Sequence, residues 1–536
     1  MTPQESLHEV IRATAAAVAG AEVPAVKLEV PPRAELGDYS TNAPLLLAPR
    51  LGASARDVAE RLGGELHARL GAALERFEVA GPGFLNLHLA DSWFIEALGG
   101  VLADGERFGA RTPDASATIN VEFVSANPTG PLHIGHARHA AYGDALSRIL
   151  EFRGFDVTRE YYINDQGSQV LKLGESVRAV ALGEPLPEGG YPGAYVATLV
   201  APERARDLDL DTLSREAAAA CLAQIRNSLE RFGVRFDVWF SERSLHEGGE
   251  VERVLAVLDE RGETYTDDGA LWLRTSSHGD DKDRVLVRSS GEHTYFTADI
   301  AYLEDKRERG YQRILYVWGA DHHGYIARMK AACAALGGDP AELEMVIGQF
   351  VHLVGLEGRT AMSKREGEYV TLDELVDEIG VDAARFLLLA RSHDTTVDLD
   401  LDLAVRESSE NPVYYVQYAH ARIASILERA GAERVSAAIE RPAPVEPLHP
   451  SERALLQRLL AFPGELAEAV ERRAPHRVAS YALELAQDYT AFYRDCHVLG
   501  VEPSATESWR LALSVAARRT IARALELLGV SAPSEM

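Results

Sequence analysis

The stretch Ser125–Leu146, "SANPTGPLHIGHARHAAYGDAL", joins an apolar run to a helix-like run and decides the fold. The residues just before the turn, "TINVEFVSA" (118–126), predict a buried strand. Those after it predict a helix and then a second strand, "DVTREYYI". A strand–helix–strand order is a βαβ unit, which builds a parallel sheet. The stretch therefore lies where the first strand of an open α/β sheet ends, and such sheets bind ligands at that end.

Two histidines and several glycines in this turn indicate phosphate chemistry. His133, Gly135 and His136 lie where the helix is expected to begin. A helix start offers free N–H groups and a positive dipole end, and glycine lets the backbone approach an anion. Histidines three apart can both donate to oxygens whose charge grows during nucleotidyl transfer. The spacing alone is also compatible with surface histidines or with a metal site.

Later strand patterns belong to the same sheet. "RILYVWGAD" (313–321) and "EMVIGQFVHLVG" (344–355) are strand-rich and bounded by turn residues. We expect an insertion of helices and short strands at about 165–275. This insertion separates the later strands from the first βαβ unit. The sequence thus predicts a Rossmann-type parallel-sheet catalytic domain over residues 113–403.

The two ends of the chain predict smaller domains. Residues 1–112 combine a helix over about 3–19 with alternating runs typical of strands, so we expect an N-terminal α+β domain. Residues 404–536 repeat apolar positions every three or four residues, which predicts an all-α helical bundle. The expected fold class is α/β in the centre, with an α+β domain before it and a helical bundle after it.

Composition limits the partners and the compartment. The net charge of −27 seems unfavourable for a polyanion, but residues 404–536 hold 15 Arg against 17 Asp and Glu, so local basic faces are available there. The three cysteines lie far apart, which suits a reducing cytoplasm without a disulfide framework or zinc site. The absence of any run of about 18 apolar residues predicts no membrane partner.

Several motifs resemble those of one enzyme family. "HIGH" (133–136) resembles the nucleotide-binding signature of class I aminoacyl-tRNA synthetases, and the longer "VEFVSANPTGPLHIGHARHAAYGDAL" resembles its arginyl-tRNA synthetase version. Blocks similar to that family's follow in order and spacing: "REYYINDQGSQ" (159–169), "YFTADIAY" (295–302), "YVWGADHHGY" (316–325) and "NPVYYVQYAHARI" (411–423). The resemblance implies an arginine–tRNA ligase that uses ATP with Mg²⁺, L-arginine and tRNA(Arg), and a family that is commonly monomeric.

The family's second signature, KMSKS, is present in a degenerate form, "TAMSKREG" (360–367). Ala361 replaces the first lysine and Arg365 the final serine. The family's role for this loop implies that Lys364 balances the β- and γ-phosphates of ATP, with Arg365 or Arg359 helping. A lysine on an ordinary surface loop is the alternative.

The resemblance also implies the nucleotide site. His133, His136 and Lys364 are the expected catalytic residues. Gly319 would let the ribose lie against the backbone, and Asp321 or His322 would bind its hydroxyls, although Asp321 could equally cap the next helix. The full set expected to bind ATP is Pro131, His133, Gly135, His136, Gly319, Asp321, His322, Met362, Ser363 and Lys364.

Arginine as a substrate requires an acidic pocket, because its guanidinium is always charged and presents five donors. The residues that the resemblance implies for it are Glu122, Ser125, Asn127, His133, Tyr295, Asp299 and His322. Tyr295 and Asp299 are four apart, on one face of a helical turn. Core packing of Tyr295 and a structural ion pair of Glu122 are the alternatives. Lysine lacks the fork and would leave acceptors unpaired, so we expect no editing domain.

Transfer RNA is expected to contact the bundle and the N-terminal domain. Tyr414, Gln417, Tyr418 and Arg422 offer the stacking and hydrogen-bonding groups that read unstacked loop bases. A tyrosine stripe at helical spacing can also be buried in the bundle. The N-terminal domain resembles the module with which this family touches the tRNA elbow.

Two other functions remain open at this point. Another class I synthetase would need a different pocket: a zinc site for the cysteinyl enzyme, or cationic residues instead of Asp299 and Glu122 for the glutamyl enzyme. A catalytically dead tRNA-binding protein derived from a synthetase would be expected to have lost "HIGH", "GADHHG" or Lys364. Amino-acid-dependent pyrophosphate exchange separates these possibilities.

Overall fold

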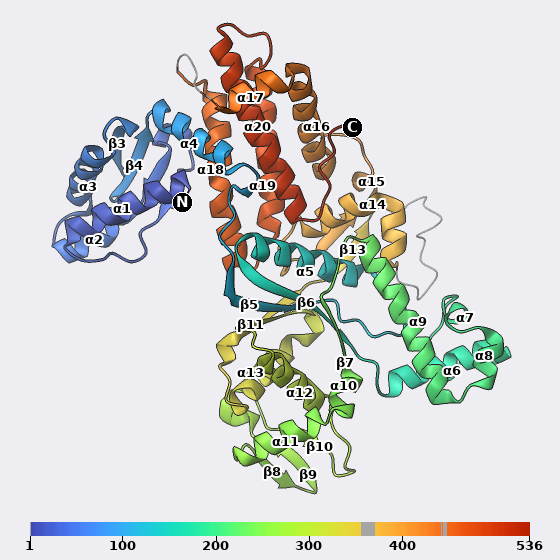
Figure 1. Cartoon of the computed structure of the whole chain (residues 1–536). Coiled ribbons are helices and arrows are strands. Elements are labelled where there is room, and N and C mark those ends of the chain that lie inside the picture. Colours follow the sequence, from blue (N-terminus) through green and yellow to red (C-terminus); the bar gives the residue numbers. More distant parts are fainter. Residues whose placement is uncertain (1, 355–369, 441, 443–446) are drawn as a thin grey trace.

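The computed structural model describes residues 2–354, 370–440, 442 and 447–536. In Figure 1 the parallel sheet lies at the centre, the N-terminal domain to one side of it, and the C-terminal helices on the far side of helix α5 (Ile134–Phe152). No helix in these ranges is both long and apolar enough to cross a lipid bilayer.

The central sheet has five parallel strands in the order β12-β11-β5-β6-β7. Its strands are β5 (Asp114–Glu122), β6 (Phe155–Ile163), β7 (Val238–Ser241), β11 (Arg313–Gly319) and β12 (Leu343–Gly348). Counted along the chain, this is the 3-2-1-4-5 order of a Rossmann-type sheet, and the order reverses between β5 and β11. The predicted fold class is confirmed. The crevice at the reversal between β5 and β11 lies beside the stretch Ser125–Leu146.

Helix α5 packs closely on the sheet, as the βαβ prediction requires. Gly143 makes this approach possible, because a Cβ atom at that position would lie 2.2 Å from the ring of Phe123. The same helix has buried residues on the side toward the C-terminal helices, among them Ile149. Helix α5 is therefore the element shared by the sheet and the bundle.

The segment expected as one insertion, 165–275, is divided by a strand of the main sheet. Strand β7 pairs in parallel with β6 from Glu160 to Ile163, inside the range predicted to lie outside the sheet. The prediction of one continuous insertion is therefore wrong. It failed because β7 is only four residues long, which is too short to give a clear apolar pattern. Two lobes replace the single insertion, one before β7 and one after it.

The first lobe, called the insertion lobe below, is helical and has its own core. Its helices are α6 (Ser168–Leu182), α7 (Val196–Leu199), α8 (Pro202–Asp207) and α9 (Leu210–Arg231). Leu173, Val196 and Leu213 are completely buried among them. Figure 1 shows this lobe projecting away from the sheet, while Ile225 and Leu229 near the end of α9 belong to the main hydrophobic core.

The second lobe follows β7 and packs against the β11 side of the sheet. Its elements are α10 (Glu242–Glu247), α11 (Glu250–Glu260), β8 (Thr264–Asp267), β9 (Ala270–Leu273), β10 (Arg284–Val287), α12 (Tyr295–Glu308) and α13 (Ile326–Ala335). Strands β8, β9 and β10 form a small antiparallel sheet. Helix α12 brings its first turn to the crevice of the main sheet.

The N-terminal domain is α+β, as predicted. Its elements are α1 (Pro3–Ala19), β1 (Leu28–Glu29), β2 (Tyr39–Thr41), α2 (Ala43–Leu51), α3 (Ala55–Leu70), β3 (Leu74–Ala80), β4 (Phe84–Leu89) and α4 (Asp91–Asp104). The helix expected over about 3–19 is α1, and Thr2 caps it through a capping box with Glu5.

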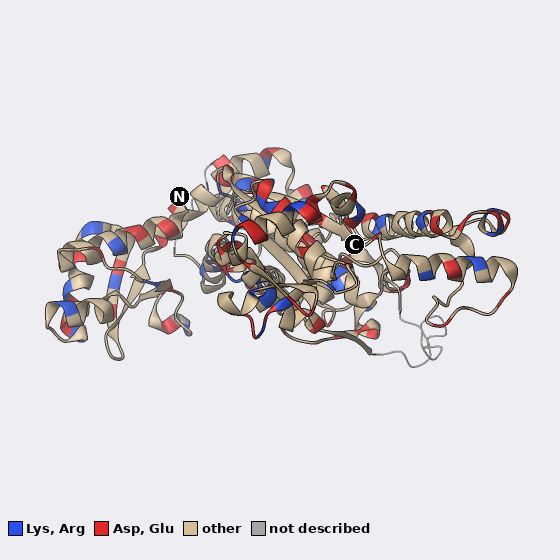
Figure 2. Cartoon of the chain, turned by 90° about the horizontal axis from the view of Figure 1, so that it is seen from below, with Lys and Arg blue, Asp and Glu red and all other residues tan. Residues whose placement is uncertain are grey.

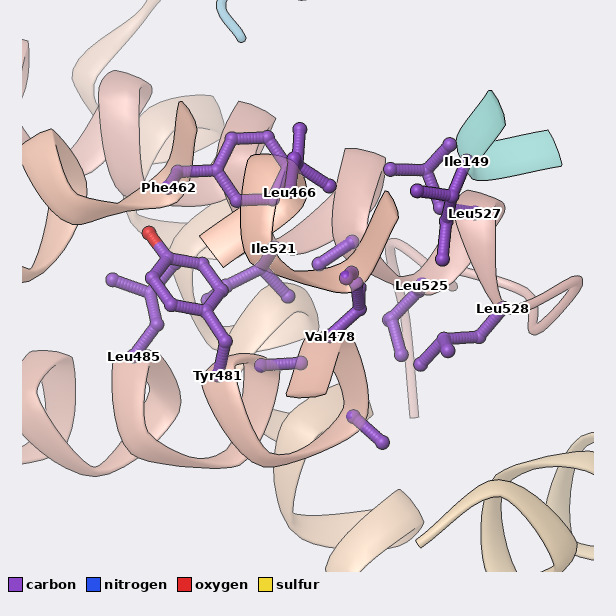
Figure 3. Close-up of a cluster of buried hydrophobic side chains, with 14 of the residues drawn as sticks. Ile149, Phe462, Leu466, Val478, Tyr481, Leu485, Ile521, Leu525, Leu527 and Leu528 are labelled. Atoms are coloured by element: carbon purple, nitrogen blue, oxygen red, sulfur yellow. The ribbon is translucent and has the colours of Figure 1, made fainter. Parts of the chain in front are cut away.

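The C-terminal quarter is helical, as predicted. The short strands β13 (Val351–Val354) and β14 (Val397–Asp400) form a parallel pair, and α14 (Leu372–Leu389) lies between them in the chain. The helices after β14 are α15 (Leu401–Ala404), α16 (Pro412–Ala430), α17 (Ala432–Glu440), α18 (Pro450–Glu471), α19 (His476–Asp495) and α20 (Ser504–Leu527). Figure 3 shows Phe462, Tyr481 and Ile521 meeting in its core, with Ile149 of α5 beside Leu527. Bundle and catalytic domain share one hydrophobic core.

One arginine joins the N-terminal domain to the bundle. Arg453 of α18 donates to both carboxylate oxygens of Asp38, at 3.0 and 2.8 Å, and to Asp91 at 2.6 Å. Gln457 donates to Asp38 at 2.7 Å, and Arg453 also covers the ring of Phe94. Asp38 is buried, so these charge-assisted bonds fix the angle between the two domains.

Candidate active site

A cavity of about 820 Å³ opens at the carboxyl ends of β5, β11 and β12, where the strand order reverses. Sequence-predicted residues from four separate segments meet there. Those that line it are Glu122, Ser125, Asn127, His133, Gly135, His136, Tyr295, Asp299, Gly319, Asp321 and His322. The expected arginine-binding and ATP-binding residues therefore face one space.

His133 and His136 form the capping box of helix α5. His133 is the N-cap, its Nδ1 accepts from the N–H of Gly135 at 3.1 Å, and the Nδ1 of His136 accepts from the N–H of His133 at 3.3 Å. Their rings stack with centroids 3.8 Å apart. Because each Nδ1 accepts a backbone N–H, each neutral ring has its proton on Nε2.

Both histidines stay uncharged at neutral pH. Burial lowers the pKa of His133, and burial together with the neighbouring His133 and His139 lowers the pKa of His136 to about 3. Each ring lines the cavity, is neutral, and carries its donor N–H on Nε2. The hypothesis that these histidines bind phosphate requires such neutral N–H donors. A group of three His, Cys, Asp or Glu side chains that could bind a metal ion is absent from the described residues.

His139 is a cavity residue that sequence reasoning missed. It lies one turn after His136 on α5, and burial lowers its pKa to about 4. A Cβ atom at Gly348, the last residue of β12, would lie 2.7 Å from its Nε2, so this strand end accepts only glycine beside the histidine. The three-residue spacing from His136 was the signal that could have identified it.

Asp299 is the acid at the other side of the cavity. The hydroxyl of Tyr325 donates to its carboxylate, and among the described residues no Lys or Arg pairs with it. Desolvation, together with the nearby Glu242 and Glu122, raises its pKa to about 7, although the hydrogen bond from Tyr325 lowers it. Within the described ranges, the position is therefore a desolvated carboxylate without a Lys or Arg partner.

Glu122 is paired within the protein. Lys306 of α12, which has no exposed surface, donates to Glu122 Oε2 at 2.6 Å, and Ser125 donates to its Oε1 at 3.0 Å. The ammonium of Lys306 also lies 4.4 and 4.2 Å from the ring centres of Tyr302 and Tyr316. The structural ion pair left open as an alternative for Glu122 is present, while Glu122 still lines the cavity.

A second buried acid, Glu242, lies next to Tyr162 of the cavity lining. It follows β7 directly, is 5% exposed, and has its pKa raised by burial. His246 is 3.9 Å away, and Tyr162, which lines the cavity, is hydrogen-bonded to it. Sequence reasoning missed Glu242 because β7 was assigned to the insertion, so the residue after it was not expected at a strand end.

The remaining predicted contacts differ in exposure. Tyr295 is 62% exposed at the start of α12, so the core-packing alternative is wrong for it. Asp321 and His322 are exposed and lie 3.1 Å apart. Asp321 does not cap α13, whose N-cap is Tyr325. A Cβ atom at Gly319 would lie 2.7 Å from Asp321 Oδ1, and the expected ribose contact at Gly319 stays a prediction.

Some residues predicted to contact ATP are not among those that line the cavity. Pro131 is exposed and does not line the cavity. Met362, Ser363 and Lys364, like Ala361, lie outside the described residues. Their roles stay predictions.

The predicted tRNA contacts form an aromatic cluster on the bundle. Tyr414 and Tyr418 stack with centroids 6.0 Å apart, and the guanidinium of Arg422 lies 4.8 Å from the ring of Tyr418 and 5.1 Å from that of Tyr493. Gln417 differs: it is 8% exposed and donates to Asp382 and to the carbonyl of Ser531. Its side chain is engaged within the protein, and Tyr493 is a neighbour that sequence reasoning missed.

Charge is mixed over the rest of the molecule. Figure 2 shows Lys and Arg alternating with Asp and Glu along the helices of the N-terminal domain and of the insertion lobe. A surface of this kind offers local basic groups to a polyanion without a single strongly positive face.

Three family models match the chain in order. The arginyl-tRNA synthetase N-terminal domain matches residues 5–89, and the class I (R) tRNA synthetase catalytic domain matches 97–177 and 207–425. The DALR anticodon-binding domain matches 416–536. The three matches follow one another along the chain, and the last two overlap at residues 416–425.

Full-length relatives carry one name. The chain is 46% identical to the arginine–tRNA ligase of Geobacillus thermodenitrificans, over 99% of both chains. It is also 46% identical to that of Frankia alni, over all of both chains. Among solved structures, Thermus thermophilus arginyl-tRNA synthetase superposes with a TM-score of 0.80 at 26% identity, covering 99% of this chain and 100% of that one.

Proposed function

The chain belongs to the arginyl-tRNA synthetase family, and we propose that it carries out arginine–tRNA ligation in the cavity between β5 and β11. It is a class I enzyme that activates L-arginine with ATP to arginyl-adenylate and transfers the arginyl group to the 3′ end of tRNA(Arg). Pyrophosphate leaves in the first step and AMP in the second. The observation that supports this site most directly is Asp299, a desolvated carboxylate in the cavity that pairs with no Lys or Arg of the described residues.

The guanidinium of arginine is proposed to bind at Asp299, with Tyr295 at the mouth and Glu242 behind. A cation brought to Asp299 replaces the proton that desolvation otherwise keeps there. Glu122, already neutralised by Lys306, is suited to orient the α-amino group together with Asn127 rather than to hold a second full charge. Lysine would bring one point charge and leave acceptors of the guanidinium fork without donors.

The first chemical step is a displacement at the α-phosphorus of ATP. A carboxylate oxygen of arginine attacks in line, the bond to the bridging oxygen breaks, and pyrophosphate leaves with the electron pair. The Nε2–H groups of His133 and His136 are proposed to donate to the non-bridging α-phosphate oxygens as their charge grows. Neither histidine needs to transfer a proton, which agrees with their lowered pKa values.

The nucleoside is proposed to lie across the ends of β11 and β12. Gly319 and Gly348 present backbone without side chains to the cavity, and Asp321 and His322 are proposed to accept from or donate to the ribose hydroxyls. Phe350, 64% exposed at the rim of the cavity, offers an apolar face to the adenine. Lys364, with Met362 and Ser363, is proposed to bind the leaving pyrophosphate. Mg²⁺ would enter bound by oxygens of the ATP phosphates, as is usual for this ion.

The tRNA is proposed to meet the bundle through Tyr414, Tyr418 and Arg422, whose stacked rings and guanidinium suit unstacked bases. The N-terminal domain, fixed by Arg453, would touch the tRNA elsewhere. Because the phosphate backbone dominates such binding, its affinity should fall with salt. We further propose a cytoplasmic monomer.

Amino-acid-dependent ATP–pyrophosphate exchange tests this function. Each of the twenty amino acids is assayed with and without tRNA(Arg), in the wild-type chain, Asp299→Asn, and Asp281→Asn as a control, since Asp281 is a surface carboxylate in the same lobe. Exchange should depend on arginine and be lost only in Asp299→Asn. Exchange driven by glutamate or cysteine, or none even with tRNA, would contradict the proposal.

A further inference from the structure

The turn after β5 is strained. Val124 and Ser125 have φ angles of +69° and +41°, in the left-handed region that L-residues with side chains rarely adopt. Val124 is β-branched, which makes this conformation still less favourable. Such strain persists only where surrounding contacts hold the backbone in place, and it concentrates at functional sites. The loop 124–130, which lies between the proposed arginine and phosphate contacts, therefore needs external support.

Part of this support comes from the neighbouring strand β6. The hydroxyl of Tyr161 donates to the carbonyl of Ala126 at 2.8 Å, and the N–H of Tyr162 donates to Ser125 Oγ at 3.1 Å. These bonds reach the first half of the loop, next to the strained residues. They do not reach Thr129 or Gly130, at the turn toward His133.

The second half of the loop is held by the insertion lobe. The hydroxyl of Tyr195 donates to the carbonyl of Thr129 at 2.7 Å, across 66 residues of sequence. A Cβ atom at Gly130 would lie 3.3 Å from the same hydroxyl oxygen, so the tyrosine packs against the loop backbone. The side chain of Asn127 donates to Gln169 of α6 at 2.6 Å, a second bond from the same lobe.

The core of the insertion lobe sets the position of Tyr195. Tyr195 immediately precedes α7, whose Val196 and Leu199 are buried in that core with α6 and α9. The residue also lies in 178–206, between the two stretches that the catalytic-domain family model matches. The hydrogen bond from Tyr195 to loop 124–130 thus comes from a segment that belongs neither to the central sheet nor to the matched part of the catalytic domain.

We propose that Tyr195 is a positioning residue through which the insertion lobe holds loop 124–130 in register for the adenylation step. The inference rests on the proposed function of the cavity. The loop carries Asn127 toward arginine and leads into His133 beside the phosphate, so its position sets the geometry of attack. A loosened loop still binds each substrate but presents them poorly aligned, which lowers kcat more than it raises either KM.

The test compares Tyr195→Phe with Tyr481→Phe. Tyr481 also donates its hydroxyl to a backbone carbonyl, that of Arg458 at 2.9 Å, but within the bundle core of Figure 3. Pyrophosphate exchange is measured with tRNA(Arg), and rates are divided by the active-site concentration from adenylate formation. With this normalisation, a smaller amount of folded protein does not lower the rate per active site, so it is not mistaken for poorer alignment of the substrates.

Tyr195→Phe should lower kcat per active site by about threefold to tenfold, the size expected for one neutral hydrogen bond, with the KM values for arginine and ATP within about twofold. Tyr481→Phe should leave kcat per active site unchanged. In a double-mutant cycle, Tyr195→Phe and Gln169→Leu should be non-additive in kcat, because both act on one loop.

Two results would overturn the inference in distinguishable ways. A wild-type chain without arginine-dependent exchange removes the proposed function, and this inference with it. A wild-type chain with exchange, in which Tyr195→Phe matches Tyr481→Phe in kcat per active site, removes only the role of Tyr195.

Discussion

His133 caps the helix on which His136 lies, and the two rings stack with centroids 3.8 Å apart. Their Nδ1 atoms accept from backbone N–H groups, so the protein fixes the proton of each neutral ring on Nε2. The same three-residue spacing therefore begins the helix and orients two neutral donors.

Replacing His136 should slow adenylation without abolishing the fold. His136→Ala removes a preorganised donor and should reduce arginine-dependent pyrophosphate exchange by a factor on the order of 10². His136→Gln keeps an uncharged N–H donor and should recover part of the rate, because the histidine acts without being protonated. Wild-type turnover in His136→Ala would remove this residue from the mechanism.

Asp299 should lower the stability of the ligand-free protein at alkaline pH. Its pKa is raised to about 7, above the usual value, so the protonated form stabilises the native state, and this contribution is lost as pH rises from about 4 through 7. Asp299→Asn should therefore have a higher Tm than wild type at pH 8 and a much smaller advantage at pH 5. Thermal unfolding at the two pH values checks this. A Tm difference independent of pH would show that the carboxylate is not desolvated.

The cavity should reject L-citrulline, which has nearly the shape of arginine but no charge. Its urea oxygen would face the Asp299 carboxylate, so it should bind weaker than arginine by a factor on the order of 10³. Calorimetric titration of each amino acid into the protein measures the ratio. In Asp299→Asn the ratio should shrink toward one, and an unchanged ratio would place guanidinium recognition elsewhere.

The Asp38–Arg453 contact should matter for tRNA more than for adenylation. Arg453→Ala leaves Asp38 buried without its arginine, which should cost about 2 kcal/mol or more of domain docking. The KM for tRNA(Arg) in aminoacylation should rise, while the KM for ATP and arginine stays unchanged.

Arg458→Ala is the matched control for that measurement. Arg458 lies on the same helix, but its partners Asp488 and Glu484 belong to the bundle itself. Equal rises in the KM for tRNA(Arg) in both variants would indicate general damage to the bundle rather than loss of the interdomain contact.

The sheet and its first turn could be predicted from local sequence patterns because their residues are contiguous. The strand before Ser125 and the helix after His133 follow apolar periodicity, and their order alone implies a parallel sheet. Strand β7 could not be recognised, because four residues give no usable periodicity and only pairing with β6 defines it. Glu242 was missed for that reason.

The partner of Glu122 was also beyond sequence reasoning. Tyr295, Asp299, Tyr302 and Lys306 recur at helical spacing, so one face of α12 was available as a signal. Nothing in that spacing indicates that Lys306 meets Glu122 from a strand 184 residues away. Tyr195 is similar, since its contact with Thr129 depends on how the insertion lobe folds back.

Arginine is proposed to bind at Asp299, a carboxylate that is partly protonated before the amino acid binds. Calorimetric titration of L-arginine at pH 7, in buffers of different ionisation enthalpy, counts the protons released on binding. With a pKa of about 7 at Asp299, wild type should release about half a proton per arginine bound, and Asp299→Asn none. No proton release by wild type, or equal release by both chains, would contradict the assignment of the guanidinium to Asp299.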